Sequence, residues 1–575
     1  MAHIYGDPAE FKDDMVAGFV SAYGRYVERV PGASAVRRRG GARQGKVSLI
    51  TGGGSGHYPA FCGTVGQGLA DAAVIGDVFT SPSGEQAYRT AKALDGGAGV
   101  LFSFGNYAGD VLNFAAAQER VRAEGVDCRT VLVTDDVASA PATDQGKRRG
   151  IAGTFVVFKT VGAAADRGES IDSVERLARK ANDRTRSFGV AFAGCTLPGQ
   201  REPLFTVPAG EMELGMGIHG EPGIESVPRV DAAELAETLL RPLLAEQPDG
   251  ADGRIAVILN GLGGSKYEEL FVLWKSLSAL LDRAELRVTL PEVGELITSL
   301  DMAGASLTLT WLDDELAELW AAPADTPAFR RGAITEPPRF EQVATGPVED
   351  AATVTATADA DSIRAAGTVR AVLAAMLEAV TEQEAELGRL DAVAGDGDHG
   401  SGMVRGLRAA TAAAGKTDGG VGATLDAAGL AFGDRAGGTS GMLWGVLLQA
   451  VGRSLGDTGM PTGQALCDAV RAGIADLQRV GNAQLGDKTM LDALIPFADA
   501  FAAAVNAGTA CATAWREAGL LATRAAAETA ALTPKLGRAR PLAQRSVGSP
   551  DPGAVSMALC LTAAGDVLAS GRGDE

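Results

Sequence analysis

The sequence predicts a multidomain protein in which an α/β domain, made of two α/β subdomains, precedes an all-α helical bundle or barrel. Three observations predict this fold class. The chain has 575 residues, too many for one hydrophobic core. Short β-rich runs alternate with Ala-rich helical patterns over residues 1–330. Beyond a Pro-containing stretch the strand pattern nearly disappears, and amphipathic helical segments fill residues 361–575.

The composition argues against several classes of protein. A formal net charge of −20 disfavours nonspecific binding to nucleic acid or to anionic lipid. The six cysteines are scattered without a C-x-x-C motif, so we expect neither a zinc site nor a disulfide framework. The N-terminus has no basic segment followed by an apolar one, and no run of about 18 apolar residues occurs. We therefore expect a cytoplasmic protein with no nucleic-acid or membrane partner.

The first subdomain, about residues 1–185, is expected to form a largely parallel sheet. Its strand candidates are residues 47–51, 73–76, 99–104 and 129–134. Each is followed by a polar loop that contains glycine. Ligands of such sheets bind beyond the carboxyl ends of the strands, so these loops are the candidate site.

Two of these loops carry groups suited to acid–base chemistry. Gly52-Gly-Gly-Ser-Gly-His57 lacks the ending of a P-loop but lets a small polar ligand approach the backbone closely. His57 is a candidate general acid or base, or a structural histidine in a tight turn. Asp110 occupies a similar loop position, where it either binds a hydroxyl group or serves only the turn.

The second subdomain, residues 186–330, contains a third unusual loop. Its strand candidates are residues 189–192, 255–259 and 307–311. His219 lies in a glycine-rich turn beside acidic residues, which could hold its ring in a defined tautomer. Three of the four histidines, His57, His219 and His399, thus lie in glycine-rich polar loops. The stretch 261–268 has the wrong glycine spacing for a Walker A motif, and we expect a capped helix start there.

Residues 331–360 are rich in Pro, Ala, Thr and Asp and are expected to form an interdomain linker. In the helical domain that follows, the polar residues concentrate in loops. Besides the acidic loop 391–400, these are residues 432–441, 485–493 and 545–553. The glycine turn at 437–441 suits phosphate contact at a helix start. An ordinary helix connection is the alternative for each loop.

The acidic loop holds three carboxylates, Asp391, Asp396 and Asp398, within eight residues. Its glycines fit the G-x-G-x-x-G pattern, but a helical segment precedes it where a dinucleotide-binding turn needs a strand. Its carboxylates would also repel a bare phosphate. They would instead suit Mg²⁺, which takes carboxylate and phosphate oxygens together. The alternative is a set of solvated loop acids.

Seven motifs in this order resemble the single-chain, ATP-dependent dihydroxyacetone kinases. They are Gly52-Gly-Gly-Ser-Gly-His-Tyr-Pro-Ala60, Asn106-Tyr-Ala-Gly-Asp110, Gly215-Met-Gly-Ile-His-Gly-Glu-Pro-Gly223, Asp391 with Gly395-Asp-Gly-Asp-His-Gly400, Gly437-Gly-Thr-Ser-Gly441, Gly486-Asp-Lys-Thr-Met-Leu-Asp492 and Asp551-Pro-Gly553. The resemblance covers almost the whole chain. It implies a ketose-binding domain at 1–330, an ATP- and Mg²⁺-binding domain at 361–575, and a homodimer whose active site joins a substrate domain with a nucleotide domain.

The resemblance also implies roles for single residues. His219 would form a covalent hemiaminal with the ketone carbon, a capture that excludes polyols because they have no carbonyl group. Asp110 would orient or deprotonate the terminal hydroxyl, with His57 hydrogen-bonding nearby. The turn of Gly53, Gly54, Ser55 and Gly56 would line the pocket. Asp391, Asp396 and Asp398 would bind Mg²⁺ between the ATP phosphates. The residues implied to contact ATP are His399, Gly438, Thr439, Ser440, Thr489, Met490, Asp551 and Gly553.

The chain departs from the family pattern near the ketose loops. Where these kinases usually read G-H-E-P-A-H, this chain has Tyr58 and Phe61, and Gly105 replaces a lysine. A pocket of different size and hydrogen bonding favours a four-carbon ketose such as erythrulose, instead of or besides dihydroxyacetone. Two alternatives come from other classes: a lyase that releases cyclic FMN from FAD, or a non-catalytic ketose sensor.

Overall fold

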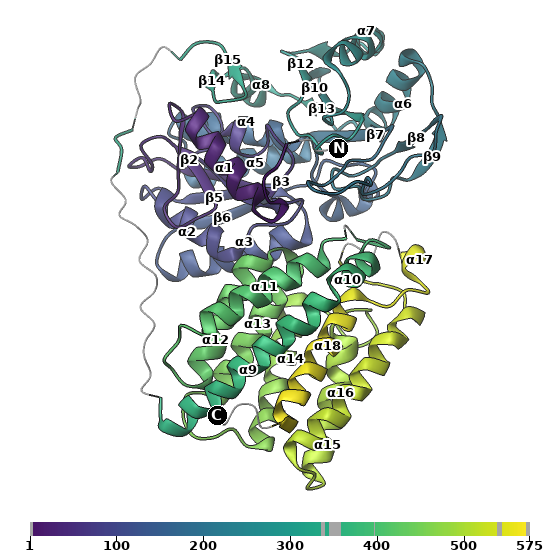
Figure 1. Cartoon of the computed structure of the whole chain (residues 1–575). Helices are drawn as coiled ribbons and strands as arrows, with labels where there is room; N and C mark the ends of the chain where they lie inside the picture. The colour runs from purple at the N-terminus through teal and green to yellow at the C-terminus, as the bar shows by residue number, and fades with distance from the viewer. Residues whose placement is uncertain (1–3, 335–339, 344–357, 396, 538–542, 571–575) are drawn as a thin grey trace. The chain divides into compact units, whose positions relative to one another are not determined.

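The computed structural model describes residues 4–334, 340–343, 358–395, 397–537 and 543–570 (Figure 1). The chain divides into two compact units, residues 1–348 and 349–575. The boundary between them lies within residues 331–360, the predicted linker, and most of that stretch lies outside the described residues.

The first unit begins with a six-stranded sheet in the order β1-β2-β4-β3-β5-β6. Its strands are β1 (Val27–Arg29), β2 (Ala35–Arg38), β3 (Ser48–Ser55), β4 (Ala72–Val78), β5 (Val100–Gly105) and β6 (Cys128–Val133). The four strands from β3 to β6 are parallel, whereas β1 and β2 pair antiparallel at one edge. The expectation of a largely parallel sheet is therefore right for the part that carries the ligand loops.

Helices cover both faces of this sheet. They are α1 (Phe11–Ala22), α2 (Gly84–Leu94), α3 (Ala108–Ala123), α4 (Thr154–Asp166) and α5 (Ile171–Asp183). α2 and α3 share one core with Ile50, Val74 and Phe102, and α1 and α4 share the core on the other face with Leu49 and Leu101. This alternation of neighbouring strand residues between two cores is what buries both faces of a parallel sheet.

A second, seven-stranded sheet follows in the same unit. Its strands are β7 (Thr185–Ala191), β8 (Glu211–Leu214), β9 (Glu225–Pro228), β10 (Arg254–Gly261), β11 (Arg287–Val288), β12 (Glu292–Gly294) and β13 (Gly304–Trp311). β13 pairs antiparallel with both β7 and β10. The helices are α6 (Ala232–Leu244), α7 (Tyr267–Arg283) and α8 (Asp314–Ala321), and a small pair, β14 (Ala324–Asp325) and β15 (Arg330–Arg331), ends the unit. The predicted helix start is confirmed, because Glu269 accepts a capping hydrogen bond from the Lys266 backbone N–H (2.7 Å).

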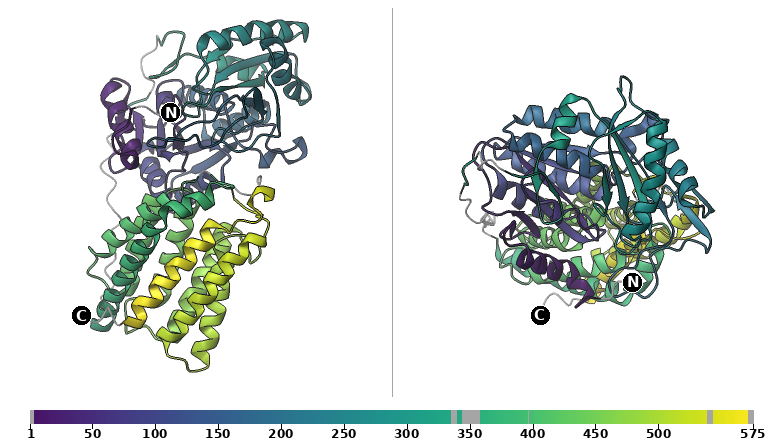
Figure 2. Two further views of the ribbon diagram at one scale, coloured as in Figure 1. Left: turned by 45° about the vertical axis from the view of Figure 1, so that its right-hand side comes forward. Right: turned by 90° about the horizontal axis from the view of Figure 1, so that it is seen from above.

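The second unit contains only helices among its described residues (Figure 2). They are α9 (Ala360–Glu382), α10 (Glu384–Asp391), α11 (His399–Ala414), α12 (Val421–Ala436), α13 (Gly438–Leu455), α14 (Gly463–Gly481), α15 (Leu491–Asn506), α16 (Cys511–Glu528), α17 (Ala543–Ser546) and α18 (Pro552–Ser570). The predicted helical segment before the acidic loop consists of two helices, because the backbone leaves the helical conformation at Gln383. α18 is long and apolar enough to cross a membrane, yet half of its apolar window is buried in the core of this unit.

Candidate active site

His219 follows β8 in a turn that holds its ring in one orientation. Its Nδ1 lies 2.9 Å from Glu221 Oε1, and its backbone N–H donates to Glu221 Oε2 (3.0 Å). Burial alone would raise the pKa of Glu221, but His219 and Arg149 hold it well below the usual range, so this carboxylate is ionised and can only accept. Nδ1 therefore carries a proton in this contact, and in the neutral form of the ring the lone pair is on Nε2.

His57 lies two residues after the end of β3, with only 1% of its surface exposed. Its Nδ1 lies 2.7 Å from the backbone carbonyl of Thr298, which can only accept a hydrogen bond. Burial, and then the nearby His219, lower the pKa of His57 to about 3. The ring is thus neutral, and its buried Nε2 has no hydrogen-bond partner among the residues that the structure describes. It can accept a hydrogen bond from a bound hydroxyl group.

The structure brings the two imidazoles together. Their ring centroids are 4.8 Å apart, and the two ring planes are nearly perpendicular. The Phe79 ring contacts both, and the Tyr107 ring lies 4.5 Å from that of His219. α3 begins directly after Tyr107 and carries the buried Asp110 in its first turn, so the third predicted residue belongs to the same cluster of loops.

The glycine turn differs from the expected loop, because β3 continues through it to Ser55. Gly52, Gly53 and Gly54 pair with β4 as strand residues. Side chains from elsewhere occupy the space beside them: a Cβ on Gly53 would lie 2.5 Å from the Phe61 ring. A cavity of about 430 Å³ opens beside the turn, lined in part by Gly54, Ser55 and Gly56.

The three residues that depart from the family pattern differ in their burial and in how close they lie to His57. Phe61 is buried against Gly53, and its ring centroid lies 6.3 Å from that of His57. Tyr58 is 42% exposed and packs edge-on against Phe19. At Gly105 a Cβ would lie 2.9 Å from the Tyr107 ring, so the space that a longer side chain would need is filled. Of the three departures, Phe61 changes the wall next to His57.

Charge around His219 is balanced by residues that sequence reasoning missed. Arg149 bonds Asp136 at 2.7 Å and approaches Glu221 at 3.8 Å. Asp136 is fully buried, which raises its pKa even though Arg149 opposes the shift. Neither residue lies in a recognisable motif, and only the fold brings both beside Glu221.

In the helical unit, the acidic loop folds back on itself. The Gly397 N–H donates to Asp391 Oδ2 (2.8 Å), and Asp398 is the residue immediately before α11. Asp396, the third predicted metal ligand, lies outside the described residues. Within the described part of the chain no three His, Cys, Asp or Glu side chains form a metal-binding group, so the predicted triad stays a prediction.

The other predicted loops of this unit meet the acidic loop. Burial, and then the charges of Asp492 and Asp391, raise the pKa of Asp551 to about 7, so Asp551 lies within electrostatic reach of both carboxylates. Asp492 accepts hydrogen bonds from the N–H groups of Gly486 (2.6 Å) and Thr489 (2.7 Å). A Cβ on Gly553 would lie 3.6 Å from Met490 N.

The glycine turn before α13 completes this end of the helical unit. Gly438, Thr439 and Ser440 form the first turn of an 18-residue helix, whose backbone N–H groups suit an anion. The carbonyl of Ala436, the last residue of α12, lies 3.6 Å from where a Cβ on Gly402 of α11 would be. His399, by contrast, is buried, and its Nε2 lies 2.9 Å from Ser556 Oγ, so its ring ties α11 to α18.

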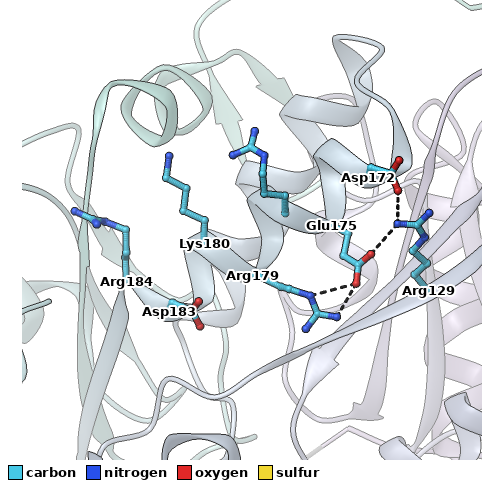
Figure 3. A pocket seen from close by; sticks show the side chains of 8 residues that line it. Arg129, Asp172, Glu175, Arg179, Lys180, Asp183 and Arg184 are labelled. Carbon is cyan, nitrogen blue, oxygen red and sulfur yellow. Dashed lines mark hydrogen bonds and ion pairs between the residues drawn. The ribbon is translucent and has the colours of Figure 1, made fainter. Parts of the chain in front are cut away.

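A separate charged cavity lies on the surface of the α/β unit, along α5 (Figure 3). Arg129 there bonds Asp172 (2.6 Å) and Glu175 (2.8 Å), and Arg179 bonds Glu175 (2.6 Å). These cations are compensated by carboxylates of the protein itself. The cavity contains none of the predicted site residues.

Comparison with known proteins gives matches over both units. Residues 17–328 match the Dak1 domain and residues 393–566 the DAK2 domain. The chain is 52% identical over 574 residues to a D-erythrulose kinase of Mycolicibacterium smegmatis, with 99% of each chain covered. It is 50% identical over 578 residues to an L-erythrulose kinase of Pectobacterium atrosepticum, with 99% of this chain and 97% of the relative covered.

Among solved structures, the dihydroxyacetone kinase from C. freundii in complex with AMP-PNP and Mg²⁺ is similar over both units. It is 29% identical, and the match covers 98% of this chain and 99% of that chain with a TM-score of 0.53. The two-domain fold predicted from the sequence is thereby confirmed. With both domain matches and full-length relatives at this identity, the chain belongs to the dihydroxyacetone kinase family.

Proposed function

We propose that this protein is an ATP- and Mg²⁺-dependent kinase that phosphorylates a terminal hydroxyl of erythrulose, and of dihydroxyacetone less efficiently. The observation that carries the proposal is the pair of imidazoles whose Nδ1 atoms are both occupied, by Glu221 and by the Thr298 carbonyl. In its neutral form each ring therefore has its lone pair on Nε2, the nitrogen that would meet a bound ketose. A binding module without chemistry has no need of two such nitrogens side by side.

His219 would capture the substrate through Nε2. The lone pair forms a bond to the ketone carbon, the carbonyl π electrons move to oxygen, and that oxygen takes up a proton from a water molecule, which regains one from Nδ1 by way of Glu221. The Nδ1 proton, held 2.9 Å from Glu221, can shift toward the carboxylate as positive charge develops on the ring. The result is a hemiaminal, which glycerol and other polyols cannot form.

Asp110 and His57 would act on the hydroxyl that receives phosphate. The neutral His57 accepts a hydrogen bond through Nε2 and orients the hydroxyl, while Asp110 orients or deprotonates it. The buried position of both residues supports these roles, because a dry pocket strengthens each hydrogen bond. Gly54, Ser55 and Gly56 line the cavity and would contact the ligand there, while the Phe61 ring fills the space beside Gly53.

The converging loops of the helical unit would hold ATP. Asp391, Asp396 and Asp398 are the proposed Mg²⁺ ligands, and the N-terminus of α13 with Thr439 and Ser440 the proposed phosphate contact. Bound Mg²⁺ supplies neutralisation of the phosphate charge. Hard carboxylate oxygens are the donor type that this ion prefers, which supports the fit. His399 would hold the acidic loop in place, because its hydrogen bond to Ser556 joins the start of α11 to α18.

The substrate assignment is tested with a panel. ADP release from ATP is measured with dihydroxyacetone, D-erythrulose, L-erythrulose and glyceraldehyde, and FAD with Mn²⁺ or Mg²⁺ is added in a separate arm. We expect the highest kcat/KM with one erythrulose enantiomer, because the full-length relatives above are erythrulose kinases. A clear preference for dihydroxyacetone contradicts the tetrulose assignment, and FAD consumption without ketose would identify a lyase.

Covalent capture is tested with His219→Ala. We expect ketose turnover to vanish or KM to rise sharply, and an unchanged kcat/KM would reject capture. Light scattering on the same samples reports the proposed homodimer, expected at about twice the 58.7 kDa of the chain.

A further inference from the structure

Two residues beside the His57 turn have a backbone conformation that side chains disfavour. Phe79, directly after β4, has φ 58°, and Leu300, in the loop before β13, has φ 51°. A bulky residue in the left-handed region costs on the order of 1 kcal/mol or more and is retained only where surrounding contacts enforce it. Both residues lie against the same short turn, although 221 residues of chain separate them.

Both strained residues hold the turn through their backbones. The Phe79 N–H donates to the Ser55 carbonyl (3.0 Å), and the Leu300 N–H donates to the Gly56 carbonyl (2.8 Å). Their side chains also close on Gly56: a Cβ there would lie 2.9 Å from the Phe79 ring and 3.3 Å from Leu300 Cγ. Gly56 itself has φ +97°, so any other residue type at this position would be strained.

The Phe79 ring extends this contact to the catalytic imidazole. It stacks on the His57 ring with a centroid distance of 5.0 Å and an interplanar angle of 22°. The Phe79 ring also packs edge-on against the His219 ring, with a centroid distance of 5.4 Å and an interplanar angle of 74°. Only 2% of the Phe79 surface is exposed. One face of His57 is therefore covered by an aromatic ring, while Nδ1 is fixed on the Thr298 carbonyl.

We propose that Phe79, supported by Leu300, is a positioning residue that fixes the plane of the His57 ring so that its Nε2 faces the substrate hydroxyl. Phe79 follows β4, has a left-handed backbone, and places its ring over the neighbouring turn that carries His57. A misplacement of such a group by about 1 Å can cost a hundredfold in rate. The consequence for catalysis rests on the proposed ketose kinase activity, whereas the positioning itself does not.

The first test needs no substrate and measures the NMR signal of the Nδ1 proton of His57. A proton on Nδ1 that is buried and bonded to a carbonyl exchanges slowly and gives a downfield NMR signal, assigned by its loss in His57→Ala. We expect the signal in the wild type and in Phe79→Tyr, and its loss or broadening in Phe79→Leu and Leu300→Ala. Phe155→Leu, a buried phenylalanine of α4, is the matched control and should keep it. A signal that persists unchanged in both Phe79→Leu and Leu300→Ala overturns the proposal.

The second test is a double-mutant cycle in kcat/KM with the preferred ketose. Phe79→Leu should lower kcat/KM at least about tenfold in the wild type but change it less than about twofold in the His57→Ala background. Phe79→Tyr should restore most of the activity, since it keeps the aromatic face. Additive losses, or equal losses in Phe79→Leu and Phe79→Tyr, show that Phe79 acts by some route other than His57. If the wild type phosphorylates no ketose, the proposed function fails, and the NMR result alone decides the positioning.

Discussion

At the scale of single residues, Glu221 sets the chemistry of His219. It accepts hydrogen bonds from both the ring N–H and the backbone N–H of His219, and Arg149 approaches its Oε2 at 3.8 Å. Replacing the carboxylate with an amide keeps its shape but removes the negative charge that favours a proton on Nδ1. We expect Glu221→Gln to lower kcat/KM about 10- to 100-fold, as the loss of an orienting partner typically does.

The matched control for this variant is Glu225→Gln, an exposed carboxylate on β9, which should leave kcat/KM unchanged. Equal activity of Glu221→Gln and the wild type would show that the carboxylate does not orient His219.

Glu221 also has a consequence for stability against pH. Its folded pKa lies below the ordinary value, so its ionised form stabilises the fold fully above about pH 4.3, where an unfolded glutamate is ionised. This stabilisation is lost as the pH falls through the folded pKa. We expect the free energy of unfolding of the wild type to fall below about pH 4.3 more than that of Glu221→Gln, measured by urea denaturation. Parallel pH profiles for the two proteins would contradict the assignment.

A site residue can be predicted from the sequence when it lies in a local motif, but not when its partner is far away along the chain. His57, Asp110 and His219 are visible because each lies in a local pattern of glycine and polar residues. Thr298 is not, since it lies 241 residues from the His57 ring that it holds. Phe79 is also invisible as a functional residue, because its role comes from a backbone angle and a stacked ring that no composition pattern reveals.

At the scale of elements, the sequence misleads where tertiary packing overrides local preference. Residues 52–55 are glycine-rich and favour a turn, yet β3 runs through them. The reason is that pairing with β4 and close contacts from Phe114 and Phe61 leave room only for glycine. The break at Gln383 has no glycine or proline to signal it, so one helical segment is expected where α9 and α10 occur.

Ion pairs that join elements should differ in strength according to burial. Arg38 of β2 bonds Asp71 (3.0 Å) and Asp166 (2.9 Å) and is 6% exposed, whereas Arg129 of β6 bonds its carboxylates at the surface (Figure 3). Removing one partner of a buried network leaves uncompensated charge. We expect Arg38→Ala to lower the free energy of unfolding by about 3 kcal/mol or more, and Arg129→Ala by about 1 kcal/mol or less.

Urea denaturation with and without about 1 M NaCl separates the two cases, since salt screens exposed pairs far more than buried ones. Similar losses for both variants, or a strong salt effect on the Arg38 pair, would contradict this ranking.

At the scale of the whole molecule, the fold class follows from the sequence because each half has a uniform periodicity. Strand–helix alternation before residue 330 and helical spacing after residue 361 are global patterns, which single exceptions do not erase. The antiparallel pairing of β1 with β2 and of β13 with its neighbours is not predictable in this way. Strand direction depends on how the connecting segments cross in space.

The two units also have separate hydrophobic cores, which leads to a prediction for the intact chain. The cores of the first unit contain residues from Val16 to Phe329, and that of the second contains residues from Ala365 to Leu561. We therefore expect two calorimetric transitions, one for each unit.

A ligand stabilises only the unit that binds it, by about 2.7 kcal/mol at a hundred times its Kd. Mg²⁺–ATP should accordingly raise the Tm of one transition by about 5 °C or more, and the preferred ketose that of the other. Asp398→Asn should abolish the first shift and His219→Ala the second, each without affecting the other. A single transition that both ligands raise together would show that the two cores unfold as one cooperative unit.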